Sequence, residues 1–369
     1  MPKFNALHLV LPAVWVGLLS TIAPVHAEET VHLYNWNDYF AENTLEEFQK
    51  KTGIRPVLDL YDNNDVLEAK LFAGSSGYDV VFPTARPFGA RQIKAGLYQP
   101  LDKSKLPGLD QLDPAVMASL KELDPDNAHL VPYLLGTTGL GINVAKVKAA
   151  LGPDAAIDTW AILFDPAQAA KLKSCGISIL DDATEAFAAA LAWLGKDPNS
   201  RVSDDLDAAA KALKDARKSI RYFHSSQYIS DLANGDLCVA HGYSGDILQA
   251  RSRAEEAAKG VTVSFQIPRE GAVLATDVVA IPKDAPNPAA AHAFIAYLLE
   301  PAVIADITNH VKYANANPAA TPLVAEAVRT DPGIYPTEAV RQKFIVLKTP
   351  SDKQLRDLNR RWTRIKAER

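Results

Sequence analysis

The first third of the chain alternates short strands with helices, and this order most constrains the fold. Strands are predicted from Val31 to Asn35, from Val57 to Tyr61 and from Asp79 to Phe82. Helices are predicted between them, one opened by the Thr44-x-x-Glu47 capping pattern and one from Asp65 to Ala73. Such an order calls for a parallel, doubly wound sheet with right-handed crossovers. We therefore expect an α/β fold whose ligand binds beyond the carboxyl ends of the strands.

The rest of the chain continues the α/β pattern. A strand at 130–135 is expected to enter a glycine-rich crossover at 136–141, and 145–234 is expected to be mostly helical. Later strands are predicted at 237–240, 261–267 and 278–281, with helices at 246–258, 289–299, 301–308 and 335–366. The pattern indicates two α/β lobes with a cleft between them.

The first residues have the order of a secretory signal. Lys3 precedes an apolar run from Leu7 to Leu19, and small residues follow up to Ala27, after which we expect cleavage. No later apolar run approaches the ~20 residues needed to span a bilayer. The formal net charge of −5 does not suit nucleic acid, which binds a basic face. We expect an exported protein that is free in solution.

The chain has two cysteines, Cys175 and Cys238. An even count in an exported protein favours a disulfide. The alternative is two buried free thiols. A catalytic thiol is disfavoured because neither cysteine lies in a recognisable nucleophile context.

Two distant clusters combine aromatic rings with a carboxylate. One follows the first strand, and the other lies some 200 residues later: Tyr34-Asn35-Trp36-Asn37-Asp38-Tyr39 and Tyr243-Ser244-Gly245-Asp246. A carboxylate accepts charge-assisted hydrogen bonds from an ammonium group, and aromatic faces attract the same cation. The clusters therefore predict a small cationic ligand held between two parts of the fold.

The chain does not match the enzyme and metal-binding motifs that it partly resembles. The stretch 242–246 lacks the final glycine of a nucleophile elbow, and glycines 136, 139 and 141 are in the wrong order for a dinucleotide loop. The 8 histidines include no helical pair with metal-ligand spacing. We expect no catalytic, cofactor or metal site, and a catalytic carboxylate pair is the enzyme alternative that the sequence leaves open.

Several motifs in order carry a family resemblance. They lie at 34–39, 67–71, 77–81, 92–96, 228–235, 242–246 and 331–336. Over nearly all its mature length the chain resembles the periplasmic putrescine/spermidine-binding proteins of bacterial ABC importers. The resemblance implies a two-lobed periplasmic-binding-protein fold (type II), with a ligand cleft between lobes joined by a hinge. It also implies a periplasmic protein that binds a small cationic polyamine and docks on an inner-membrane ABC permease, and we expect a monomer.

The resemblance further implies where the chain crosses between lobes. Lobe 1 would contain residues 28–135 and 258–311, and lobe 2 residues 136–257 and 312–369, after a signal peptide at 1–27. Both cysteines then fall in lobe 2, where they match the family's disulfide.

Site residues are carried over position by position. The resemblance implies these ligand-binding residues: Trp36, Asn37, Asp38, Tyr39, Thr84, Glu185, Tyr243, Asp246, Asp277 and Tyr313. A diamine has two charged ends and an apolar middle, so separated acids and stacked rings suit it.

Three departures from the family leave the exact ligand open. Asn37 stands where serine is common, as Thr84 does while keeping a hydroxyl, and the stretch 273–276, ending in Ala275 and Thr276, lacks the usual phenylalanine pair. The stretch 84–89 carries one extra residue and adds the cation Arg86 beside the site. Arg86 could bind a carboxylate if it faces the cleft, and it would have little effect if it points to solvent. The alternatives are a related amine such as agmatine, an ω-amino acid, or a polyamine-sensing role with a membrane receptor.

Overall fold

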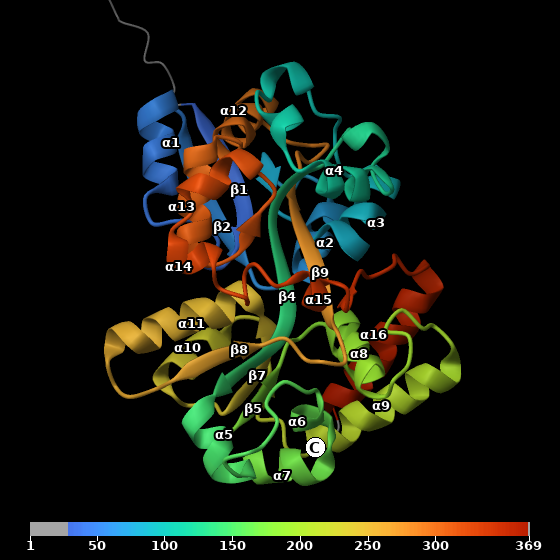
Figure 1. The fold of residues 1–369 in the computed structure, drawn as a ribbon. Helices are drawn as coiled ribbons and strands as arrows, with labels where there is room; N and C mark the ends of the chain where they lie inside the picture. Colours follow the sequence, from blue (N-terminus) through green and yellow to red (C-terminus); the bar gives the residue numbers. More distant parts are fainter. Residues whose placement is uncertain (1–28, 368–369) are drawn as a thin grey trace, which may run out of the picture.

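The computed structural model describes residues 29–367, which form two α/β bodies, one above the other in Figure 1. The upper body is built on a parallel sheet of order β2–β1–β3 and on the first half of the long strand β4. The lower body is built on β5 to β8 and on the second half of β4. The signal peptide predicted at 1–27 lies outside the described residues.

The predicted strand–helix succession forms the upper sheet. Strands β1 (Thr30–Trp36), β2 (Arg55–Tyr61) and β3 (Val80–Val81) alternate with helices α1 (Thr44–Thr52) and α2 (Asn64–Ala73). Helix α1 ends because Gly53 takes a left-handed conformation, with φ 75°. The capping-box prediction was wrong in detail, since Thr44 is the first helical residue and Asn43 precedes it without a side-chain cap. The parallel order confirms the α/β prediction.

Strand β4 (Val131–Asn143) connects the two bodies. Its first half pairs with β9 (Ala272–Val279), and its second half pairs with β7 (Val239–Tyr243) and β8 (Val263–Gln266). The strand predicted at 130–135 is longer than expected, because it continues through the glycines of the predicted crossover. They serve close packing instead: a Cβ on Gly136 would lie 2.6 Å from the Tyr313 ring.

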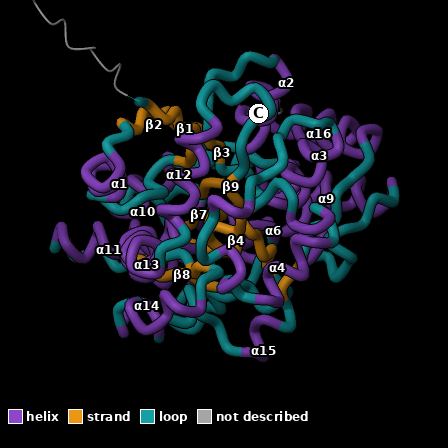
Figure 2. Tube along the Cα trace, turned by 90° about the horizontal axis from the view of Figure 1, so that it is seen from above, coloured by secondary structure: helices purple, strands orange, loops and turns teal. Residues whose placement is uncertain are grey.

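The remaining elements surround these sheets. The upper body adds α3 (Ala90–Lys94), α4 (Pro114–Lys121), α12 (Pro288–Leu298), α13 (Pro301–Val311), β10 (Ala314–Asn315) and α14 (Glu326–Arg329). The lower body adds α5 (Val144–Leu151), α6 (Ala161–Phe164), α7 (Pro166–Leu172), β5 (Ile177–Ile179), α8 (Ala183–Trp193), α9 (Ser203–Arg217), β6 (Tyr222–Phe223), α10 (Gln227–Asn234) and α11 (Ser244–Ala257). The last elements are α15 (Glu338–Arg341), β11 (Phe344–Ile345) and α16 (Asp352–Ala367). Figure 2 shows the strands at the centre with helices around them.

Two predicted segments contain more strand than expected. The stretch 145–234 includes β5 and β6 besides its helices, and 335–366 is interrupted by β11. Both β5 and β6 are short strands of a mixed sheet of order β11–β9–β4–β7–β5–β6. Their few residues lie between helices, so local composition gave little sign of them.

Strand pairing also bears on where the chain crosses between the bodies. Strand β8 pairs with the second half of β4, whereas Ala314 and Asn315 pair with Leu135 and Leu134 in the first half. Asp331 then reaches Arg251 on α11, with 2.6 Å between Oδ2 and Nη2. We therefore propose crossings near residues 136, 274 and 331.

The disulfide between Cys175 and Cys238 is present, with 5.5 Å between the two Cα atoms. It joins the end of the α7 region to the start of β7, within the lower body, as the sequence predicted. Among the described residues no single helix is long and apolar enough to cross a membrane. The bent pair α12 and α13 satisfies that test together, by length and composition only.

Candidate ligand-binding cleft

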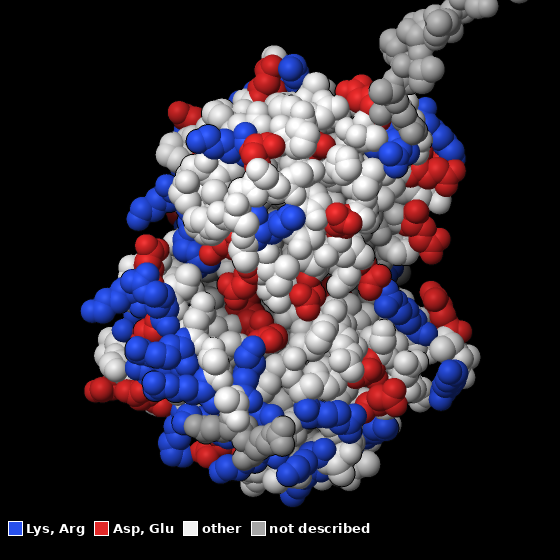
Figure 3. All heavy atoms as spheres, turned by 180° about the vertical axis from the view of Figure 1, so that it is seen from behind, with Lys and Arg blue, Asp and Glu red and all other residues white. Residues whose placement is uncertain are grey.

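A cleft lies between the two bodies, with about 760 Å³ of empty space including the open solvent at its mouth. Its lining comes from the ends of several elements. Trp36 ends β1, Thr84 follows β3, and Tyr243 ends β7, so side chains gather beyond the carboxyl ends of parallel strands as predicted. Asp and Glu side chains gather at the waist between the bodies in Figure 3.

The structure brings together most of the predicted site residues. Those that line the cleft are Trp36, Asn37, Tyr39, Thr84, Glu185, Tyr243, Asp246, Asp277 and Tyr313. Asp38 does not line it. The backbone of Asp38 takes a left-handed conformation with φ 52°, and its carboxylate lies 3.2 Å from Nη2 of Arg253 on α11.

One carboxylate of the cleft, Asp277, is held by two hydroxyl groups of the upper body. Tyr39 donates a hydrogen bond to Oδ2, and Thr84 Oγ1 donates to Oδ1 at 2.6 Å. Asn64 in turn donates to Thr84 Oγ1 at 3.0 Å, which orients the hydroxyl. Loss of water around the carboxyl raises the pKa of Asp277 to about 6, although the two hydrogen bonds oppose this shift. The group is poised to ionise when a cation approaches.

A second carboxylate, Asp246, is held in the same way in the first turn of α11. Tyr228 donates to Oδ2 at 2.7 Å, and Tyr313 donates to Oδ1 at 2.9 Å. Burial raises the pKa of Asp246 to about 7, against the effect of these hydrogen bonds. The positive charge of Arg253 also lowers this pKa, but its effect is smaller than that of burial.

Two further acids line the lower wall at the start of α8. Asp182 caps this helix, and its Oδ1 accepts from the backbone N–H groups of Thr184 at 2.8 Å and Glu185 at 3.1 Å. Burial raises the pKa of Asp182 to about 6. Burial and the neighbouring Asp182 raise the pKa of Glu185 well above its ordinary value, and Glu185 Oε2 has no hydrogen-bond partner among the described residues. The lower wall thus carries two carboxyl groups whose ionised forms are disfavoured by burial.

Aromatic rings form the wall between these acids. The Trp36 ring centroid lies 4.8 Å from that of Tyr61, 6.2 Å from that of Tyr243 and 6.5 Å from that of Tyr39. Trp36 Nε1 donates to the carbonyl of Phe82 at 2.8 Å, which fixes the indole. Fixed rings beside carboxylates attract cations through their faces and cover methylene groups.

Arg86 belongs to the lining, but its charge is engaged. Nη2 donates to Glu122 Oε2 at 2.8 Å and to the carbonyl of Ser119 at 3.0 Å. Both partners lie at the end of α4, outside the cleft lining. From the sequence, Arg86 could face either the cleft or the solvent. In the structure its guanidinium is instead directed to Glu122.

Several lining residues were missed by the sequence reasoning. They include Tyr61, Asp62, Asn64, Asp182, Thr184, Ser225 and Ser226. Asp182 could have been found, because it precedes a helix in an Asp-Asp pair at the predicted Glu185 motif. Ser225 gave no signal, and its buried Oγ has no partner among the described residues. Asp62 Oδ2 lies 4.0 Å from His224 Nε2 across the cleft. This contact arises only because the two bodies approach each other.

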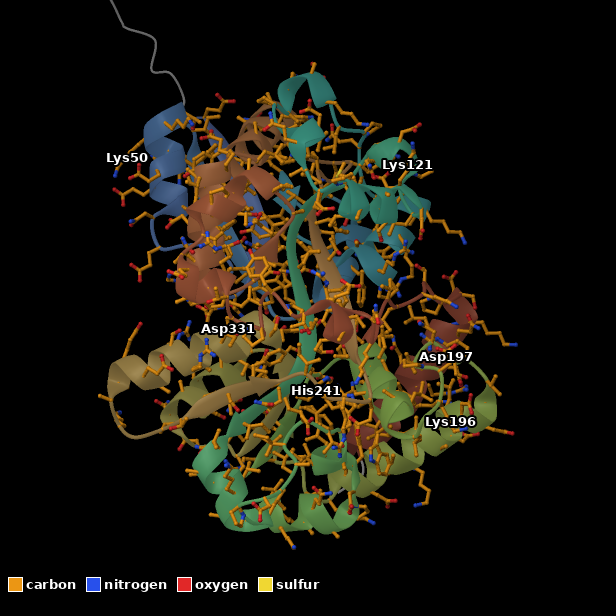
Figure 4. All side chains as sticks on the ribbon, in the orientation of Figure 1. Lys50, Lys121, Lys196, Asp197, His241 and Asp331 are labelled. Carbon is orange, nitrogen blue, oxygen red and sulfur yellow. A yellow bond between two sulfur atoms is a disulfide. The ribbon has the colours of Figure 1, made fainter. Side chains whose placement is uncertain are left out.

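One histidine is buried in the core of the lower body. His241, labelled in Figure 4, lies inside the lower body with its ring 5.3 Å from that of Trp160. Burial lowers the pKa of His241 to about 3, so it stays neutral. Within residues 29–367 no group of three or more His, Cys, Asp or Glu side chains could hold a metal ion.

A two-body α/β fold with an acidic, aromatic cleft between the bodies defines a solute-binding protein of the periplasmic-binding-protein type II fold. Residues 43–336 match the family model described as bacterial extracellular solute-binding protein, and the chain belongs to this family. The family binds solutes and is not one of enzymes.

Known relatives cover the whole chain. It is 52% identical over 358 residues to the putrescine-binding periplasmic protein PotF of Escherichia coli (strain K12), covering 97% of this chain and 95% of that one. It is 51% identical over 367 residues to the putrescine-binding periplasmic protein SpuD of Pseudomonas aeruginosa (strain UCBPP-PA14), covering 100% and 99%. Among solved structures, the TpPotD lipoprotein of Treponema pallidum superposes with a TM-score of 0.73 at 29% identity, covering 91% and 99%.

Proposed function

We propose that this chain captures a polyamine such as putrescine, cadaverine or spermidine in its cleft and delivers it to an ABC permease. The names of PotF and SpuD, each more than half identical to it, support the ligand class. The observation that carries the proposal is the pair Asp246 and Asp277, each held by two hydroxyl donors and without an ion pair to any Lys or Arg among residues 29–367.

The geometry supports a division of roles. Asp246 and Asp277 would accept hydrogen bonds from ammonium groups, each worth about 1.5–3 kcal/mol. Trp36 and Tyr243 would cover the methylene chain, and a ring face turned to an ammonium group would add about 0.5–2 kcal/mol as a cation–π contact. Glu185, with one unpartnered carboxylate oxygen, would neutralise further positive charge. The other proposed ligand contacts are Asn37, Tyr39, Thr84 and Tyr313.

Asp38 is proposed to act at a distance from the ligand. Its ion pair with Arg253 joins the upper body to the lower one. It would therefore increase ligand affinity by stabilising the arrangement in which the two bodies lie close together. We also propose that the protein works as a monomer in the periplasm, after cleavage near Ala27.

Calorimetric titration of the mature, refolded protein tests the proposal. The ligands are putrescine, cadaverine, spermidine, spermine, agmatine and 4-aminobutyrate. We expect micromolar or tighter binding of at least one di- or polyamine. Preference for 4-aminobutyrate, or no heat from any amine, would contradict the proposal. Unchanged ligand recovered from the complex would distinguish capture from turnover.

A further inference from the structure

Helix α16 presents a row of basic side chains to solvent. Lys353, Arg356, Arg360 and Arg364 are exposed and recur every three or four residues, so they lie on one side of the helix. The opposite side packs into the lower core. The helix has six basic and two acidic residues, whereas the whole chain has a net charge of −5. The helix is therefore locally positive, although the protein as a whole is negatively charged.

Part of this row has no internal electrostatic partner. The side chains of Lys353, Arg356 and Arg364 make no ion pair or hydrogen bond with the described residues. The side chain of Arg360 pairs only within its own helix, with Asp357. The cations at the sides of the helix differ, since Arg361 binds Asp207 on α9 and Lys366 binds Asp181 at 2.6 Å. The side cations hold the helix in place, and the solvent-facing ones do not.

Helix α9 places two exposed lysines beside α16. The contact between Arg361 and Asp207 joins the two helices. Lys211 on α9 and Lys218 just after it have side chains 78% and 75% exposed, and both pair with Asp215, at 2.6 Å and 3.3 Å. Figure 3 shows Lys and Arg gathered over these helices, below the acidic waist. We define the basic face by its six exposed cations: Lys211, Lys218, Lys353, Arg356, Arg360 and Arg364.

Exposed apolar side chains stand near the start of α9. Val202 precedes that helix and is 61% exposed, and Val346 is 49% exposed. Asn199 donates to the carbonyl of Val346 at 3.1 Å, which brings the two segments together. Basic residues accompanied by exposed apolar ones are the composition of surfaces that lie on membranes.

We propose that the basic face docks the protein on an anionic phospholipid surface. From Lys353 to Arg364 the row extends about 16 Å at the helical rise per residue, so its cations do not converge on one point. A plane of phosphate headgroups matches such a row better than one soluble anion does. The proposal concerns the outer face of the lower body and is independent of the ligand in the cleft.

Flotation of the purified mature protein with lipid vesicles tests the proposal. Vesicles containing phosphatidylglycerol are compared with vesicles of phosphatidylcholine alone, at about 0.01 M and about 0.15 M salt, where the Debye length falls from ~30 Å to ~8 Å. We expect binding to the anionic vesicles only, weakened by salt. Equal binding to both vesicles, or to neither, would overturn the proposal.

A matched pair of variants assigns the surface. R356Q/R360Q/R364Q should lower vesicle partitioning up to about 100-fold, from roughly fivefold for each cation near an anionic surface. The control K94Q/K105Q/K283Q removes the same charge from exposed lysines of the upper body and should leave partitioning within about twofold. Equal loss in both variants would show a net-charge effect and refute the basic face.

Two further readouts keep the conclusion separate from the proposed function. Putrescine titration of R356Q/R360Q/R364Q should match the unmodified protein, which also shows that the variant folds. A protein that ignores all amines yet floats with anionic vesicles would refute only the proposed function. Binding of the face to polyglutamate but not to vesicles would point to an acidic protein partner and refute membrane docking.

Discussion

The carboxylate of Asp38, in the upper body, lies 3.2 Å from Nη2 of Arg253 in the lower body. The carbonyl of Asp38 also accepts a hydrogen bond from Gln249 Nε2 at 3.4 Å, so two contacts from α11 meet one residue. The left-handed backbone of Asp38 turns its side chain away from the cleft lining. An acid expected to bind ligand therefore bridges the two bodies.

Replacing Asp38 by Asn should weaken polyamine binding only modestly. Both side chains are about half exposed, and such pairs contribute about 0.2–1 kcal/mol, or up to about fivefold in affinity. The loss should shrink at high salt, because screening already weakens the pair in the unmodified protein. Calorimetry at low and high salt measures both effects. A loss beyond about 50-fold that persists at high salt would instead indicate direct contact with ligand.

Replacing Asp277 by Asn should separate stability from binding. The variant removes a carboxylate that is costly to ionise, so the ligand-free protein should melt at a higher temperature near neutral pH. It also removes a charged acceptor, so polyamine affinity should fall about 10- to 150-fold. Melting curves and titration give the two readouts. Asp215→Asn, on α9 and outside the cleft lining, is the control, and it should leave affinity unchanged. Unaltered affinity in D277N would remove this acid from the site.

Ligand stabilisation should grow with pH. The folded pKa values of Asp246 and Asp277, about 7 and about 6, lie above the unfolded value of ~3.9. Their contribution to stability is therefore complete below about pH 4 and is lost as the pH rises through 6 and 7. A bound ammonium reverses this loss because it favours the ionised form. Melting temperatures with and without putrescine should differ more near pH 8 than near pH 5. An equal difference at both values would contradict the assignment. The double variant D246N/D277N should reduce the trend, and the part that remains would come from Asp182 and Glu185, whose pKa values are also raised.

The pairing of Arg86 with Glu122 predicts an asymmetric response. Replacing Arg86 by Ala should change diamine affinity by less than about threefold, because its charge is already neutralised. Replacing Glu122 by Ala should release a cation at the cleft and weaken diamine binding more. It should also improve binding of 4-aminobutyrate, whose carboxylate can pair with the released guanidinium. Titration of both variants with a diamine and with 4-aminobutyrate measures these effects. A larger change of diamine affinity in the Arg86 variant than in the Glu122 variant would mean that Arg86 already faces the ligand.

Local sequence patterns determined the first strands and helices, and the family resemblance supplied most of the predicted cleft residues. The strand–helix succession before residue 83 is encoded by short-range apolar spacing and by helix stops such as Gly53, which do not depend on distant contacts. Trp36, Thr84 and Tyr243 were predicted at strand ends or by motif, and a parallel sheet brings such ends together. The disulfide followed from the number of cysteines and the export signal, and motif resemblance supported it.

Tertiary contacts decided the rest. The glycines of β4 continue a strand because the Tyr313 and Phe265 rings, from distant segments, occupy the space of their missing side chains. Arg86 is directed to Glu122 because the end of α4 places that carboxylate within reach, and Asp38 pairs with Arg253 because the two bodies approach there. The exposed row on α16 can be read as amphipathic from its spacing, but its place beside α9 comes from the packed lower body. Spacing along the chain sets which side a residue faces, whereas its partner is set by segments that only the fold brings near.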